Sequence, residues 1–143
     1  MKIRSKLQGL MKRFGTCQKG GIAILYALSA VPVFLAAGSA IDYVRYFANT
    51  TELQAALDSA ALAAASAKDA TNEERVAVAE AIFIANLENG ALSDADITRS
   101  FEIDDNTVVA AAGMDIATSL MKFAGIETMK LSIGAEIAVP GDK

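Results

Sequence analysis

Side chains of the types that carry catalysis are few in this sequence of 143 residues. It contains no histidine, which excludes a serine–histidine–aspartate triad and a Cys/His metal site. It has neither a P-loop nor the glycine fingerprint of a dinucleotide-binding fold. We interpret Asp104 and Asp105 as turn residues, and Asp94-Ala95-Asp96 lacks the further oxygen ligands of a calcium loop. We therefore expect no catalytic residues, no cofactor, no metal and no small-molecule substrate, and we predict that the protein is not an enzyme.

Two other residues of chemical interest stand alone in the sequence. Cys17 is the only cysteine, so it cannot form an intramolecular disulfide, and it precedes the long apolar run that a lipoprotein cysteine would follow. Asn49-Thr50-Thr51 matches the glycosylation sequon, but we interpret it as an exposed helical run. The sequence assigns no role to either.

The charges are distributed unevenly along the chain. Six of the 13 basic residues lie before Gly20, whereas all 17 acidic residues lie at or after Asp42. Residues 42–143 therefore carry seven basic and 17 acidic side chains, a net charge of −10. This acidic balance disfavours nucleic acid as a partner.

A run of 22 residues without a charge, 20–41, separates the basic and acidic parts. About 20 apolar residues are enough to cross a bilayer as a helix, so we predict a transmembrane helix here. The cations before it place residues 1–19 in the cytoplasm and residues 42–143 outside, in the periplasm of a bacterium. Small residues on the helix would let another membrane helix approach closely, and Pro32 is expected to kink it. The residues assigned to this membrane anchor are Gly21, Ala23, Ala27, Leu28 and Pro32.

A signal peptide is the main alternative to a retained anchor. Gly38 and Ala40 are small residues that suit a cleavage site before Ile41, which would release a secreted periplasmic binding protein. Against this, Pro32 interrupts the apolar run and helical character continues beyond it. A membrane-anchored enzyme or sensor is a third alternative, and it would need a cleft with convergent polar groups.

The remaining sequence predicts an α+β domain. Helical periodicity continues past Asp42 to about residue 67, and Thr71 with Glu74 forms a capping-box signature for a second helix over 72–89. A β-hairpin follows, with strands at 97–103 and 107–109 joined by a turn at 104–106, then a short helix over 117–124 and a last strand over 129–139. We therefore expect a mainly antiparallel sheet of about three strands, covered by helices on one face and open at an edge.

Three stretches of the first 66 residues carry a family resemblance: 21–28 with Pro32 after it, Ile41-Asp42-Tyr43-Val44-Arg45, and residues 53–63 (LQAALDSAALA). They resemble the N-terminal segment of TadE/TadG-like proteins, in which a glycine opens the membrane helix and an aspartate closes it. The resemblance covers about residues 20–66. Its specificity comes from polar residues in an apolar background, namely Asp42, Arg45, Gln54 and Asp58.

The resemblance implies a pseudopilin-like or minor-pilin-like component of a tight-adherence, Flp-type pilus in the bacterial inner membrane. Its implied partners are the membrane and other pilus-assembly membrane proteins or pilins. The residues at the helix exit that could contact such partners are Asp42, Tyr43, Arg45, Gln54 and Asp58. Gly20 and Gly21 are the candidate processing positions, although Leu25 or Tyr26 stands where pilin-type members have a glutamate, and the chain is too short for the adhesion-type domain of larger members.

Overall fold

The computed structural model describes residues 20–88, 90–104 and 107–139. The basic tail with Cys17 and the centre of the predicted turn at 105–106 therefore lie outside the described residues. The described elements follow the order helix, helix, strand, strand, 3-10 turn and strand. This order confirms the α+β class predicted from the sequence.

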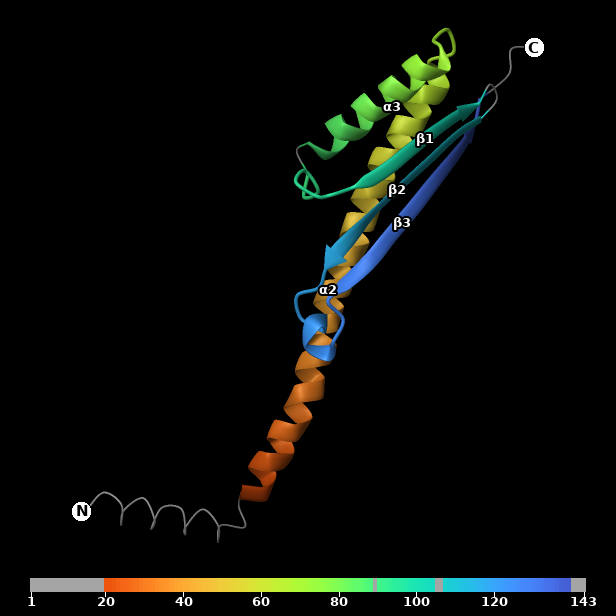
Figure 1. Cartoon of the computed structure of the whole chain (residues 1–143). Coiled ribbons are helices and arrows are strands. Elements are labelled where there is room, and N and C mark those ends of the chain that lie inside the picture. The colour runs from red at the N-terminus through yellow and green to blue at the C-terminus, as the bar shows by residue number, and fades with distance from the viewer. Residues whose placement is uncertain (1–19, 89, 105–106, 140–143) are drawn as a thin grey trace.

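The first helix, α2 (Gly20–Ser66), is 47 residues long and passes without a break through Pro32. It extends from the bottom of the molecule to the top of the domain (Figure 1). The alanine-rich second half explains its persistence, because alanine is the best helix former. The prediction that one helix continues beyond Asp42 is confirmed.

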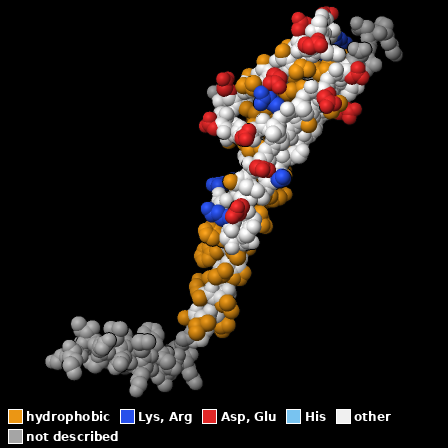
Figure 2. Space-filling model, viewed as in Figure 1, with side chains coloured by type: hydrophobic (Ala, Val, Ile, Leu, Met, Phe, Trp, Pro, Cys, Tyr) orange, Lys and Arg blue, Asp and Glu red, His pale blue; other side chains and the backbone are white. Residues whose placement is uncertain are grey.

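The two halves of α2 have opposite surroundings. Large apolar side chains of the first half are exposed, as Figure 2 shows, whereas Leu53 and Leu57 of the second half are completely buried. Ala60, Ala61 and Ala64 continue this buried face and allow the neighbouring elements to come close. The second half of α2 is thus the centre of the hydrophobic core.

The second helix, α3 (Asn72–Leu87), begins at the predicted capping box. The Thr71 backbone N–H donates to Glu74 Oε2 at 2.9 Å, and the Glu74 N–H donates back to Thr71 Oγ1 at 3.3 Å. The helix folds back along α2, and the Arg75 guanidinium, which is buried, donates from Nε to the carbonyl of Ala64 at 2.9 Å. The same carbonyl, near the end of α2, also accepts the N–H of Ala67 at 3.3 Å, so the Arg75 bond adds a second donor there.

Three antiparallel strands form the sheet in the order β1 (Thr98–Asp104), β2 (Thr107–Ala117) and β3 (Thr128–Ala138). Both helices pack on one face of it, α2 against β2 and β3 and α3 against β1. Alternate residues of β2, among them Val108, Ala110 and Ala112, point into the core. Phe83 of α3 meets Phe101 of β1 edge to face, with 6.1 Å between the ring centroids.

Two details of the sequence prediction are wrong. β2 continues for 11 residues to Ala117, where only 107–109 was expected to be strand, and the helix predicted over 117–124 is a single 3-10 turn, η1 (Met121–Ala124). Alanine and glycine favour no strand by themselves, but pairing with β3 over the whole length of β2 decides its conformation. That pairing reaches Ala117 and leaves only residues 118–127 to connect the two strands.

Candidate functional site

The apolar segment of α2, residues 20–41, cannot be accounted for by packing inside the molecule. Except for Leu35, which is partly buried, its large side chains are between half and four-fifths exposed, from Ile41 at 51% to Ile22 at 78%. Of the described residues, only α2 forms a helix long and apolar enough to cross a membrane. A helix that is apolar all round, with its side chains exposed, is stable in lipid or against other apolar helices.

The residues assigned to the anchor from the sequence all lie on this exposed segment. Gly21, Ala23, Ala27 and Leu28 are exposed, and a Cβ atom at Gly21 would meet nothing within 4 Å. Pro32 is exposed within the continuous helix. These side chains are free of contacts with the domain and available to lipid or to a second helix.

Asp42, the first charged residue after the apolar segment, is buried and anchors the connection between β2 and β3. It is 4% exposed, and its Oδ1 accepts the backbone N–H of Ser119 at 2.9 Å. Its Oδ2 accepts the N–H groups of Leu120 and Met121, each at 2.8 Å. A carboxylate that accepts several backbone N–H groups forms strong, charge-assisted hydrogen bonds.

These hydrogen bonds also decide the protonation state of Asp42. The N–H of Met121 is the largest cause that lowers the pKa of the Asp42 carboxyl below its ordinary value of 3.8, with the N–H groups of Ser119 and Leu120 and the charge of Arg45 adding to it. Burial opposes them by disfavouring the charged form. The carboxylate is therefore ionised at neutral pH.

Residues 118–127, which we call the junction loop, are held at further points. Arg45 Nη1 donates to Ser119 Oγ at 2.6 Å. Thr118 closes the base of the loop, because its N–H donates to the carbonyl of Glu127 at 2.9 Å and its hydroxyl donates to the carbonyl of Ile126. Gly125 ends the 3-10 turn with φ at 87°, a left-handed conformation that glycine adopts without strain.

Leu120 brings the junction loop onto the apolar segment itself. Gly38 is buried, and a Cβ atom there would lie 2.5 Å from Leu120 Cβ and 2.7 Å from Leu120 Cδ1. Gly38 lies one helical turn before Asp42. The absence of a side chain at Gly38 is therefore what lets Leu120 pack on the last turn of the apolar segment.

The other residues predicted at the helix exit lie apart from this junction. Tyr43 is 62% exposed on α2. Gln54 Nε2 donates to Asp58 Oδ1 at 2.8 Å, one turn further along the same helix face. The structure thus brings Asp42 and Arg45 together at the junction loop and places Tyr43, Gln54 and Asp58 elsewhere on the helix.

Sequence reasoning missed the junction loop as part of this site. Asp42 and Met121 are 79 positions apart, and the groups that bind the carboxylate are backbone N–H groups, which every residue except proline has. Within the junction loop itself, the sequence signal was Gly125, which ends a short apolar stretch. That signal indicates a turn, and it does not indicate what the turn binds.

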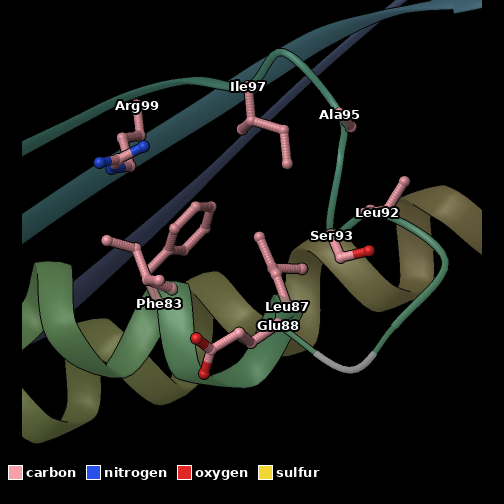
Figure 3. Close-up of a pocket in the computed structure, with 9 residues that line it drawn as sticks. Phe83, Leu87, Glu88, Leu92, Ser93, Ala95, Ile97 and Arg99 are labelled. Atoms are coloured by element: carbon pink, nitrogen blue, oxygen red, sulfur yellow. The ribbon is translucent and has the colours of Figure 1, made fainter.

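A second candidate site is the hollow between α3 and β1 shown in Figure 3. Phe83, Leu87, Leu92 and Ile97 line it with apolar surface, and Arg99 stands at one side. Arg99 is engaged in an ion pair with Glu80, 3.0 Å from Nη2 to Oε2. Within the described residues no group of three His, Cys, Asp or Glu side chains could hold a metal ion. Ser93 and Glu88 also line the hollow, and no hydrogen bond joins these two described residues.

The exposed apolar segment of α2 continues into the core of a small α+β domain, an arrangement consistent with a membrane anchor. Residues 20–67 match the model of the putative Flp pilus-assembly TadE/G-like family, which confirms the resemblance drawn from the sequence. The matched segment coincides with α2, so it includes both the apolar segment and the helix that forms the core. Comparison with curated proteins and with solved structures found no match.

Proposed function

We propose that this protein is a membrane-anchored, pseudopilin-like or minor-pilin-like component of an Flp-type pilus that serves pilus assembly or surface attachment, without enzymatic activity. The observation that carries the proposal is the coincidence of the TadE/G-like match with α2, whose first half is apolar and exposed. In this proposal residues 20–41 span the bacterial inner membrane once. Residues 1–19 lie in the cytoplasm and the α+β domain lies in the periplasm.

The continuity of α2 supports a retained anchor over a cleaved signal peptide. Cleavage after Ala40 would cut a continuous helix next to Asp42, whose carboxylate holds the junction loop. A peptidase that needs an extended chain at this position would have to unwind the helix first. Cleavage would also remove Gly38, on which Leu120 packs.

Lateral docking is the mechanism that this shape suits. Gly21, Ala23 and Ala27 provide small, exposed surface on which a pilin or another assembly protein could pack its own helix closely. Tyr43 and Phe47, both more than 60% exposed, offer further contact surface above the apolar segment, on another side of α2 from Ala23 and Ala27. The partners we propose are accordingly membrane helices of the pilus machinery.

Deletion of the gene and recovery of the native protein from a fractionated cell envelope test this function. We expect loss of surface filaments on deletion, and a protein with an intact N-terminus in the inner membrane. A start near Gly21 would indicate pilin-type processing and entry into the filament. A soluble protein that begins near Ile41, or filaments that are unchanged by the deletion, would contradict the proposal.

A pair of substitutions at one position tests the anchor directly. Ala27→Arg places a cation in the middle of the span, which costs about 2.5 to 3.5 kcal/mol on insertion scales. Ala27→Leu is the matched control, because it changes the size of the side chain and keeps it apolar. We expect the arginine variant to be lost from the membrane fraction and the leucine variant to be retained there; equal retention of both would refute the anchor.

The single cysteine makes the orientation measurable without other changes. A membrane-impermeant maleimide should label Cys17 only after the inner membrane is permeabilised, since residues 1–19 are proposed to be cytoplasmic. The matched control replaces Cys17 by serine and exposed Ser132 of β3 by cysteine, which should react from the periplasmic side. The reverse pattern of labelling would invert the proposed topology.

A further inference from the structure

The junction loop lies at the level where the apolar segment ends. Leu120 packs on Gly38, inside the run of residues 20–41, and Figure 1 shows η1 beside α2, below the lower ends of the strands. Gly38 lies four positions before Asp42 on the helix, a rise of about 6 Å. The loop therefore extends below the first charged residue, to the depth of the last apolar turn.

The side chains of the loop suit a boundary between lipid and water. Phe123 is 74% exposed, and Ile126 and Leu120 are 43% and 37% exposed. Lys122 places its ammonium 5.7 Å from the centre of the Phe123 ring. Aromatic and aliphatic side chains with adjacent cations are typical of segments that lie in the interface of a bilayer with anionic lipids.

The neighbouring face of α2 continues this surface. Ile41 and Val44 are more than half exposed, and together with Ala40 and Arg45 they line a shallow apolar hollow. Lys122 and Arg45 contribute two positive charges here, which balance the carboxylates of Asp42 and Glu127, whereas residues 42–143 as a whole carry a net charge of −10. The part of the acidic domain nearest the apolar segment therefore combines apolar surface with a balanced charge, without the acidic excess of the domain as a whole.

We propose that the junction loop is a second membrane contact, in which Phe123 and Ile126 enter the outer interface of the bilayer that α2 crosses. This inference rests on the proposed membrane anchoring. The hydrogen bonds from Ser119, Leu120 and Met121 to Asp42 hold the loop in place before it meets lipid, so little conformational freedom is lost on contact. The contact would fix how far the domain stands from the membrane and which side of it faces the surface.

Single tryptophan substitutions can measure how deeply each part of the protein lies in the bilayer, because the chain contains no tryptophan whose fluorescence would interfere. We would place one at a time in the full-length protein, reconstituted into vesicles of phosphatidylcholine and phosphatidylglycerol, with bromine on the lipid tails either near the headgroups or near the tail ends. Phe123→Trp reports on the loop and Leu28→Trp on the apolar segment. Val109→Trp, on the outer face of β2 near the end away from the loop, reports on the domain.

We expect emission from Phe123→Trp to shift to the blue and to lose intensity chiefly with the shallow bromines. Leu28→Trp should lose intensity chiefly with the deep bromines, and Val109→Trp should be unaffected by either. If Leu28→Trp is quenched while Phe123→Trp behaves like Val109→Trp, the membrane contact is refuted and the anchor stands. That result would leave the exposed Phe123 to a protein partner. If Leu28→Trp is not quenched, the anchor itself fails and the membrane contact fails with it.

Discussion

Gly38→Ala should loosen the junction loop without harming the helix that carries it. The added methyl would lie 2.5 Å from Leu120 Cβ, whereas carbon atoms in contact are about 3.5 to 4.0 Å apart, so Leu120 must retreat by about 1 Å. Overpacking of this kind costs about 1 to 3 kcal/mol. The better helix propensity of alanine does not offset this cost for the loop, because α2 is helical whether the loop is attached or detached.

The expected effect is faster hydrogen exchange at three backbone amides. The N–H groups of Ser119, Leu120 and Met121 exchange when the loop leaves Asp42, and a loss of about 1 to 3 kcal/mol raises that rate roughly 5- to 140-fold. Exchange followed by mass spectrometry on the full-length protein in lipid nanodiscs provides the measurement.

Gly21→Ala is the matched control for this experiment, because a Cβ atom there meets nothing within 4 Å. It should leave exchange in the loop unchanged. Leu120→Gly combined with Gly38→Ala removes the Leu120 Cβ that the added methyl would meet and should relieve the clash, so that the two substitutions do not add. Strict additivity, or equal exchange in the Gly38 and Gly21 variants, would refute the reasoning.

Three further predictions concern Asp42, the capping box of α3 and the aromatic side chains of the domain. The N–H of Met121 is the main cause that lowers the pKa of Asp42 in the folded protein. Attachment of the loop to Asp42 should therefore be complete above pH 3.8 and should be lost as the pH falls through the lowered pKa of the folded state. Amide chemical shifts measured against pH should record this loss, and Asp42→Asn should abolish the pH dependence. Thr71→Ala removes one half of the capping box and should lower the free energy of unfolding by about 1 kcal/mol in denaturant titrations. Phe83→Ala should lower it by about 3 to 5 kcal/mol, since Phe83 is 1% exposed, whereas Phe123→Ala at 74% exposure should leave it nearly unchanged; similar losses at both positions would contradict the described core.

The elements that could be predicted from the sequence are those with local causes. The apolar run, the alanine-rich continuation and the Thr71–Glu74 capping box each act within a few residues, and each appears as predicted in α2 and α3. The α+β class followed from the order of these signals. Local causes also explain why the boundaries of the helices were nearly correct.

The parts that could not be predicted depend on distant partners. The alanines and glycine of 110–113 have little preference for a strand, and they become one because β1 and β3 pair on both sides of them. Asp42 was expected at the surface of the membrane because it ends an apolar run. Its burial depends on backbone N–H groups more than 70 residues away, which no spacing in the sequence indicates.

Because α2 is continuous, its apolar half and its core half tilt together as one rigid helix. A helix of 47 residues is about 70 Å long, and no break separates the apolar half, which we propose spans the membrane, from the half that forms the core. A tilt of about 20°, the average for membrane helices, displaces one end of such a helix sideways from the other by about 24 Å. A neighbouring helix that changes the tilt of the apolar segment would therefore move the tip of the domain, where α2 turns into α3, without changing a contact inside it.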